Sequence, residues 1–195
     1  HSGSEARVWR MDHLIGIGGV GMSALAHALI CVGHSVSGAD RLVSSTCGSV
    51  MPESLRRLAA LGVKVYPDDG SGIGPSVDRV IVSTAIEPQN PGLVRAKELG
   101  IPVVHRAAAL AEALSAYRLV AVAGTCGKST VTAMLSAILA DCGLDPFCVN
   151  GAAVVGWNGS VRDGKGAYAV AEVDESDRSL TAFSPYAAIV TNASA

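Results

Sequence analysis

Residues 119–129 read Leu-Val-Ala-Val-Ala-Gly-Thr-Cys-Gly-Lys-Ser, and this stretch decides the fold. Five apolar residues of strand length lead into a glycine-rich turn. A helical stretch then runs from 128 to 141, and Gly143 supplies its stop. A buried strand, a glycine turn and a helix in this order form the repeating unit of parallel α/β sheets. The stretch therefore predicts an α/β fold with a binding loop at the end of a strand.

The turn at 124–129 has the composition of a phosphate-binding loop. Its backbone N–H groups can surround phosphate oxygens, Lys128 can neutralise the β- and γ-phosphates of ATP, and the Ser129 hydroxyl can bind Mg²⁺. The strict Walker pattern requires a glycine at the position of Val122. We therefore expect an ATP-binding loop that differs from the loop of common nucleotide hydrolases. The alternative is a glycine-rich turn with a solvated lysine.

A second glycine-rich turn lies near the start, where Gly16-Ile17-Gly18-Gly19-Val20-Gly21 fits G-x-G-x-x-G. It follows an apolar strand at 13–17 and precedes a helical stretch at 20–32, and Asp40 ends the next apolar segment. Such glycines let a diphosphate approach the backbone, while the helix N-terminus supplies unpaired N–H groups. The turn predicts binding of a dinucleotide or a nucleoside diphosphate. The alternative is that the glycines only permit close packing of strand and helix.

Apolar runs of strand length alternate with helical stretches along the whole chain, a pattern that predicts βα units and parallel sheets. The expected strands are 13–17, 35–38, 79–82, 103–104, 119–123, 168–173 and 187–190, and the expected helices are 20–32, 52–61, 93–99, 107–114 and 128–141. We place a domain boundary near Tyr117. Residues 1–117 are expected to form a Rossmann-like parallel-sheet domain, and 118–195 an incomplete P-loop-type α/β domain.

An acidic cluster, Glu172-Val173-Asp174-Glu175-Ser176-Asp177, follows the apolar run at 168–171. In a parallel sheet this cluster lies at the carboxyl ends of the strands, where α/β proteins bind ligands. A carboxylate there, for which we choose Glu172, can complete the shell of a Mg²⁺ ion that Ser129 begins, since Mg²⁺ takes few protein oxygens. The alternative is a solvated charged turn. Thr191-Asn192 closes the last apolar strand at the same expected edge.

The composition excludes several other classes of function. The 195 residues carry a formal net charge of −2 and no dense run of Lys and Arg, so neither nucleic acid nor a membrane surface is an expected partner. No apolar stretch reaches the roughly 18 residues of a transmembrane helix. The five cysteines form no C-x-x-C pair, which favours free thiols and a cytoplasmic location. The five histidines form no pair with metal-ligand spacing, so a histidine metal site is not expected.

Seven short stretches, in order along the chain, resemble the Mur ligases of peptidoglycan synthesis. They are His13 to Ser23, Ser37 to Asp40, Val82 to Ile86, Ala123 to Thr130, Val149 to Gly151, Ala171 to Asp177, and Val190 to Asn192. The resemblance implies an ATP-dependent ligase: ATP phosphorylates the lactoyl carboxylate of UDP-N-acetylmuramate, and the amine of L-alanine attacks the acyl phosphate. It also implies that the first domain holds UDP in place of NAD, and that Mg²⁺ accompanies ATP.

The resemblance assigns roles to individual residues of this chain. The expected catalytic residues are Lys128 and Glu172, and the expected Mg²⁺ ligands are Ser129 and Glu172. The expected ATP-binding residues are Gly124, Thr125, Gly127, Lys128, Ser129, Thr130 and Asn192. The expected UDP-sugar-binding residues are Gly16, Gly18, Gly19, Val20, Gly21, Met22, Asp40, Ser83, Thr84 and Ala85.

The chain departs from the family pattern at three places. Cys126 stands where the family usually has His or Asn, and Arg178-Ser179-Leu180 stands where Gly-Ser often follows Glu-Ser-Asp. The chain ends at Ala195, where the family continues with Asp-His and further domains. We therefore expect this piece of 195 residues to bind UDP-sugar and to turn over little or nothing.

Three other functions fit parts of the sequence. A ligase that recycles murein by joining a tripeptide to UDP-N-acetylmuramate shares both loops, although it usually has tyrosine at the position of Ser176. The first glycine turn alone fits an NAD-binding regulatory module. A binding or scaffold protein without catalytic activity is the third alternative.

Overall fold

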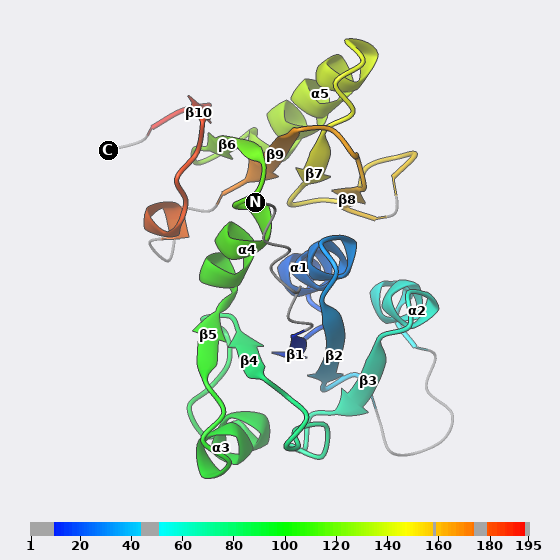
Figure 1. The fold of residues 1–195 in the computed structure, drawn as a ribbon, viewed down its shortest axis with the longest axis vertical. Helices are drawn as coiled ribbons and strands as arrows, with labels where there is room; N and C mark the ends of the chain where they lie inside the picture. The colour runs from blue at the N-terminus through cyan, green and yellow to red at the C-terminus, as the bar shows by residue number, and fades with distance from the viewer. Residues whose placement is uncertain (1–9, 44–50, 158, 174–178, 194–195) are drawn as a thin grey trace, which may run out of the picture.

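The computed structural model describes residues 10–43, 51–157, 159–173 and 179–193. Within these ranges the chain forms two five-stranded sheets, placed one above the other along the long axis, with helices between and outside them (Figure 1). The α/β class and the parallel sheets expected from the sequence are confirmed. In the described part of the chain, no helix is both long and apolar enough to cross a membrane.

The first sheet contains only parallel neighbours, in the order β3-β2-β1-β4-β5. Its strands are β1 (Met11–Ile15), β2 (Ser35–Asp40), β3 (Lys64–Pro67), β4 (Arg79–Val82) and β5 (Val103–His105), and its helices are α1 (Val20–Cys31), α2 (Glu53–Ala60), α3 (Pro91–Glu98) and α4 (Arg106–Leu114). The strand order reverses between β1 and β4. Open α/β sheets bind ligands beside such a reversal, at the carboxyl ends of the strands.

The second sheet has the order β10-β6-β9-β7-β8. Its strands are β6 (Arg118–Ala123), β7 (Phe147–Val149), β8 (Val161–Arg162), β9 (Tyr168–Glu172) and β10 (Ala187–Val190), and its helices are α5 (Lys128–Asp141) and the short 3₁₀ helix η1 (Ser179–Ala182). Only the pair of β7 and β8 is antiparallel. Strands β10, β6, β9 and β7 are parallel to one another, so the loops that follow them meet at one edge of the sheet.

Several boundaries differ from the expected ones for local reasons. Helix α3 begins at Pro91, because the Asn90 side chain accepts hydrogen bonds from the N–H groups of Gly92 and Leu93. Strand β1 ends at Ile15, before Gly16 turns the backbone with a φ of 74°. Strands β3, β7 and β8, which are two to four residues long, were not expected. The division into two domains near residue 117 stays a prediction.

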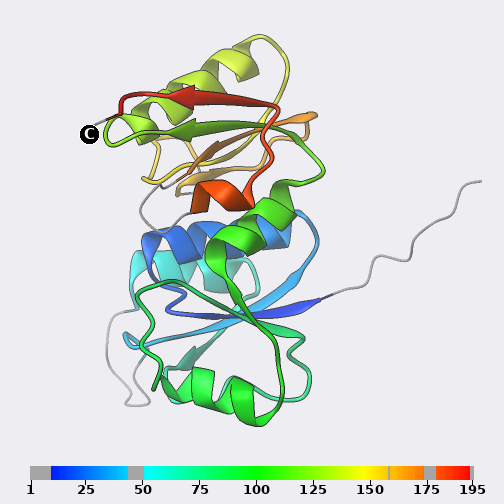
Figure 2. The same cartoon turned by 90° about the vertical axis from the view of Figure 1, so that its left-hand side faces the viewer.

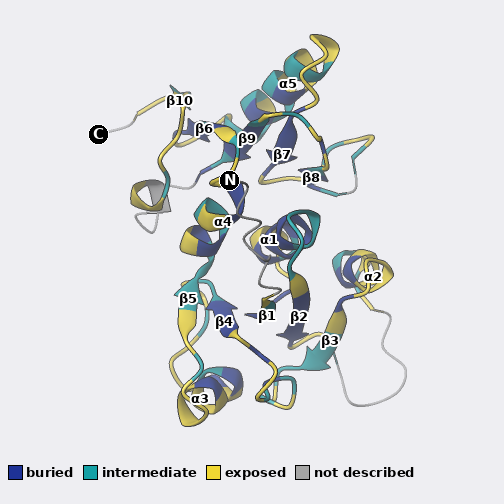
Figure 3. Cartoon of the chain, in the orientation of Figure 1, coloured by how far each residue is buried: buried dark blue, intermediate teal, exposed yellow. Residues whose placement is uncertain are grey.

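Helices α1 and α4 lie between the two sheets (Figure 2). On one side of α1, Leu25 and Leu29 pack into the core of the first sheet. On the other side, Ala24 and Ala28 pack with Phe147 and other apolar residues of the second sheet. Most of α1 is therefore buried (Figure 3), as expected for a helix that is apolar all round. One layer of helices thus serves both sheets.

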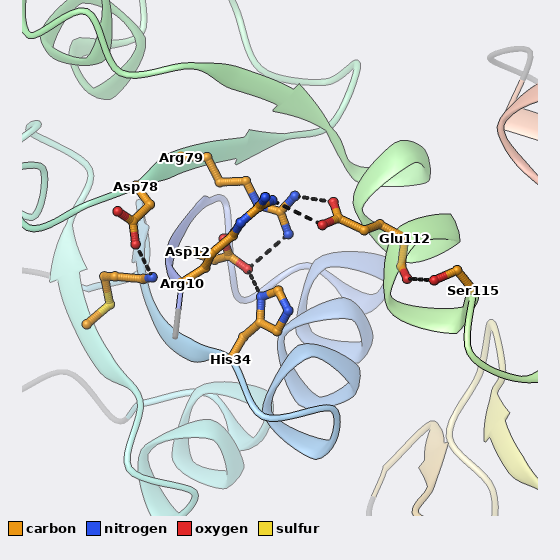
Figure 4. A network of polar contacts seen from close by, with 8 residues as sticks. Arg10, Asp12, His34, Asp78, Arg79, Glu112 and Ser115 are labelled. Atoms are coloured by element: carbon orange, nitrogen blue, oxygen red, sulfur yellow. Dashed lines mark hydrogen bonds and ion pairs between the residues drawn. The ribbon is translucent and has the colours of Figure 1, made fainter. Parts of the chain in front are cut away.

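An ion-pair network joins α4 to the amino ends of β1 and β4 (Figure 4). The Asp12 carboxylate has no exposed surface; it accepts a hydrogen bond from Arg79 Nε at 2.6 Å and lies 2.7 Å from His34 Nδ1. Arg79 also donates to Glu112 of α4 at 2.5 Å. Arg10 pairs with the other oxygen of Glu112 at 3.0 Å. Helix α4 is therefore held to the first sheet by charge as well as by packing.

His13 of β1 is a fully buried imidazole. Its Nδ1 lies 2.9 Å from Ser37 Oγ, and its Nε2 has no partner among the described residues. Burial lowers the pKa of His13 to about 4, although the charge of Asp68 raises it in part. The imidazole is therefore neutral at pH 7, and the fold disfavours its protonation.

We expect the free energy of unfolding to fall as the pH drops from 6.5 toward 4. The unfolded chain binds a proton at His13 in this range, whereas the folded chain does not. One pKa unit corresponds to about 1.4 kcal/mol, so the loss reaches roughly 2–3 kcal/mol near pH 4.5. Urea unfolding at several pH values measures it. The His13→Asn variant does not titrate here and should show a flatter curve; equal slopes would contradict the assignment.

Candidate nucleotide-binding and ligase site

The phosphate-type loop lies between β6 and α5, as expected from the sequence. Gly124 has a φ of 127° and Gly127 a φ of 81°, both in the left-handed region that favours glycine. The side chain at the N-cap position of α5 is that of glycine and caps no N–H group, and the first turn contains no acidic residue, so the N–H groups there remain available to an anion. This is the arrangement that binds phosphate groups in α/β proteins.

Two side chains hydrogen-bond to the backbone of the loop, one from the loop itself and one from the segment after β10. Lys128 Nζ donates a hydrogen bond to the carbonyl of Gly124 at 2.7 Å, which holds the ammonium group over the loop. Asn192, after β10, accepts hydrogen bonds from the N–H of Thr125 at 2.7 Å and of Cys126 at 3.2 Å. In this structure Asn192 therefore shapes the loop, and its direct contact with ATP stays a prediction. Thr130 is exposed at the start of α5.

Glu172 lies where the acidic cluster was expected, at the carboxyl end of β9. Its Oε2 accepts a hydrogen bond from Ser129 Oγ at 2.7 Å and another from the N–H of Gly151 at 2.8 Å. Two expected metal ligands, 43 positions apart in sequence, are thus brought into contact. The remainder of the acidic cluster, 174–177, lies outside the described residues, as do Arg178 and the side chains of Ser179 and Leu180.

The donor atoms at this point fit Mg²⁺. Ser129 Oγ and the Glu172 carboxylate are hard oxygen ligands beside a phosphate-binding loop, and Mg²⁺ typically combines one or two such ligands with waters and substrate phosphates. A metal site whose ligands all come from the protein would need more donor side chains than these two. Among the described residues, no three His, Cys, Asp or Glu side chains form a metal-binding group.

The first glycine turn is hydrogen-bonded to Asp40, the last residue of β2. Asp40 is buried, and its two oxygens accept hydrogen bonds from the N–H of Gly18 at 2.7 Å and of Leu42 at 2.9 Å. A Cβ at Gly18 would lie 3.2 Å from the Asp40 carboxyl carbon. The expected contact of Asp40 with a ligand stays a prediction, because this structure shows the carboxylate shaping the turn.

The other expected UDP-sugar residues surround this turn at the carboxyl ends of β1 and β4. Gly16 lies beside the turn at 83–86, since a Cβ there would be 3.3 Å from Ile86 Cδ1. Val20, the first residue of α1, is 60% exposed. The Met22 side chain differs: it is buried in the core of the first sheet, so only its backbone remains for a ligand.

A residue that the sequence analysis did not single out lies beside the first glycine turn, in a cavity that Glu172 also lines. Arg106, the first residue of α4, lines a small cavity of about 30 Å³ with Gly21 and Glu172. A larger cavity of about 330 Å³ lies between α1, α2 and the segment around Ser160. Its lining includes Gly18 of the first turn. Gly21 of the first glycine turn and Glu172 therefore border the same small cavity.

Comparisons with known proteins agree with this geometry. The family model described as "Mur ligase family, catalytic domain" matches residues 13–118, more than half of the chain. The UDP-N-acetylmuramate–L-alanine ligase of Cyanothece sp. is 41% identical over 186 residues, which are 94% of this chain and 37% of that protein. The ligase of the same name from Solidesulfovibrio magneticus is also 41% identical, over 95% of this chain and 39% of that protein.

Solved structures show the same relationship. The UDP-N-acetylmuramate–alanine ligase of Thermotoga maritima superposes with a TM-score of 0.81 at 31% identity, over 93% of this chain and 41% of that one. A tripeptide-adding ligase from Neisseria meningitides has a TM-score of 0.79 at 24% identity, over 94% of this chain and 60% of that one, and shares the fold. The chain spans somewhat over a third of the length of its curated relatives. It belongs to the Mur ligase family.

Proposed function

We propose that the protein is an ATP-dependent ligase that joins L-alanine to UDP-N-acetylmuramate in the cytoplasm. The observation that carries this proposal is the contact between Ser129, which follows Lys128 in the phosphate loop, and Glu172. Glu172 also lines a small cavity together with Gly21 of the first glycine turn. Curated relatives named for this reaction match almost the whole chain. The 24% identity of the Neisseria structure supports the fold alone and does not favour the tripeptide alternative.

The proposed reaction has two steps. An oxygen of the lactoyl carboxylate attacks the γ-phosphorus of ATP, the bond to the β–γ bridging oxygen breaks, and ADP leaves. The amine of L-alanine then attacks the acyl carbon, the bond to the phosphate oxygen breaks, and phosphate leaves while the amine loses a proton. Both steps need anionic groups held close together in a fixed orientation.

The phosphate loop supplies that positioning. The N–H groups at the start of α5 bind phosphate oxygens, and the Lys128 ammonium, 2.7 Å from the Gly124 carbonyl, turns to the β- and γ-phosphates. Ser129 and Glu172 are the residues that would hold Mg²⁺. When bound, the ion neutralises phosphate charge.

The first glycine turn takes the UDP end of the acceptor in this proposal. The N–H groups at the start of α1 have no side-chain cap and no acidic neighbour in the first turn, which suits a diphosphate. Both Asp40 oxygens already accept backbone N–H groups. In this proposal the carboxylate holds the turn in the shape that receives the diphosphate.

Calorimetric titration separates the proposal from the NAD-binding alternative. We expect UDP-N-acetylmuramate to bind and NAD to give no saturable heat at the same concentrations, because the curated relatives that match this chain are named for a UDP-sugar substrate. UDP alone is the matched control and should compete with the UDP-sugar. Tighter binding of NAD than of UDP-N-acetylmuramate would overturn the proposal in favour of a redox or regulatory module.

A further inference from the structure

The Glu172 carboxylate accepts a hydrogen bond from the backbone turn that follows the neighbouring strand β7. Strands β7 and β9 are parallel, with Val149 opposite Ala171 in the register. The residues that come next on the two strands are therefore side by side at the carboxyl edge of the sheet. There the N–H of Gly151 donates to Glu172 Oε2 at 2.8 Å.

The turn that carries this N–H group is itself fixed. Asn150 is buried, its N–H donates to the Ser160 carbonyl at 2.9 Å, and its side-chain Nδ2 donates to the Ala152 carbonyl at 3.0 Å. These two hydrogen bonds hold the backbone on both sides of Gly151. The donor therefore has one orientation, which a solvated loop would not provide.

A side chain at position 151 would force the Glu172 carboxylate to move. A Cβ at this position would lie 2.6 Å from both Cδ and Oε1 of Glu172, closer than real Cβ contacts. Oε2 already receives two donors, Ser129 Oγ and the Gly151 N–H. No hydrogen bond to Oε1 is found within the described ranges, which leaves the lone pairs of this oxygen for another ligand.

The geometry points to Gly151 as a positioning residue for the metal site: its N–H group fixes the rotamer of Glu172, and its lack of a side chain leaves room for the carboxylate. This inference rests on the proposed function, in which Glu172 and Ser129 hold Mg²⁺ with ATP. Gly151 acts through Glu172 and does not contact the substrates. Outer residues that orient metal ligands typically change metal affinity 10- to 100-fold when they are replaced.

The Gly151→Ala variant tests the inference by calorimetric titration of ATP, first in EDTA and then over a series of Mg²⁺ concentrations. We expect ATP affinity in EDTA to stay within about twofold of that of the unchanged protein, because the phosphate loop is intact. The Mg²⁺ concentration that gives half of the metal-dependent gain should rise about tenfold or more. Gly74→Ala is the matched control, since Gly74 has open space around it, and it should change neither quantity.

A second change separates positioning from general damage. In Gly151→Ala with Glu172→Asp, the shorter side chain makes room for the added methyl group, so Mg²⁺ dependence should recover in part. An unchanged Mg²⁺ midpoint in Gly151→Ala, or an equal loss of ATP binding in EDTA, would overturn the inference. If the unchanged protein shows no Mg²⁺-dependent ATP binding, the proposed function fails and the inference fails with it.

A spectroscopic measurement serves if Gly151→Ala does not fold. A hydrogen bond to a carboxylate moves the amide proton resonance of Gly151 downfield, and Glu172→Gln should reverse this shift. An amide resonance of Gly151 that does not respond to Glu172→Gln overturns the inference without any change at Gly151.

Discussion

Replacing Lys128 with methionine is expected to weaken binding of ATP about 100-fold. The variant keeps an unbranched side chain of similar length but removes the ammonium group that the loop holds 2.7 Å from the Gly124 carbonyl. A hydrogen bond to a charged group contributes roughly 1.5–3 kcal/mol, and each 1.4 kcal/mol is about a tenfold change in affinity. Calorimetric titration of ATP with Mg²⁺ measures the effect.

The control for this variant is Lys97→Met, which removes an exposed lysine of α3, far from the phosphate loop in sequence. It should leave ATP affinity unchanged. Circular dichroism should show that both variants are folded. An ATP affinity of Lys128→Met within threefold of that of the unchanged protein would contradict a role of Lys128 at the phosphates, and with it the ATP site.

The second large effect concerns stability. Replacing Arg79 with methionine is expected to lower the free energy of unfolding by about 3–5 kcal/mol, because it leaves the Asp12 carboxylate buried without its guanidinium partner. The His34 imidazole remains beside Asp12 but is an incomplete replacement. Urea unfolding at neutral pH measures the loss. The surface pair of Arg95 and Glu98 is the comparison: Arg95→Met should cost only roughly 0–1 kcal/mol.

A double variant identifies the cause of that loss. Asp12→Leu combined with Arg79→Met removes both charges, and a large part of the stability should return, since an apolar pair often replaces a buried ion pair at little cost. A double variant that is no more stable than Arg79→Met would show that the loss comes from packing and not from an unpaired charge.

The elements that carry strong local signals could be predicted from the sequence. Strand β6 and helix α5 lie within one residue of their expected bounds, because an apolar run, a glycine turn and a glycine stop mark each end. Strand β3 carried no such signal: Lys64 and Pro67 are poor strand formers. It forms because β2 offers it a parallel partner, and such pairing is not visible in a local window.

In the candidate site, too, some contacts could be predicted from the sequence and others could not. The meeting of Ser129 and Glu172 followed from a rule about topology, that loops after parallel strands share one edge. The hydrogen bond from the Gly151 N–H to Glu172 could not be predicted from the sequence, since every residue except proline has a backbone N–H group. Nor did the pairing of Asp12 with Arg79, which are 67 positions apart and have no motif between them.

The helix layer shared by the two sheets has a consequence for the distance between the two glycine-turn regions. Helix α1 packs on the first sheet through Leu25 and Leu29 and on the second sheet through Ala24 and Ala28. Because alanine side chains are short, the second sheet lies close to α1, and a larger residue at either position would push the two sheets apart. The separation between the turn at the N-terminus of α1 and Glu172 at the end of β9 therefore depends on two residues of α1 that belong to neither expected set of binding residues.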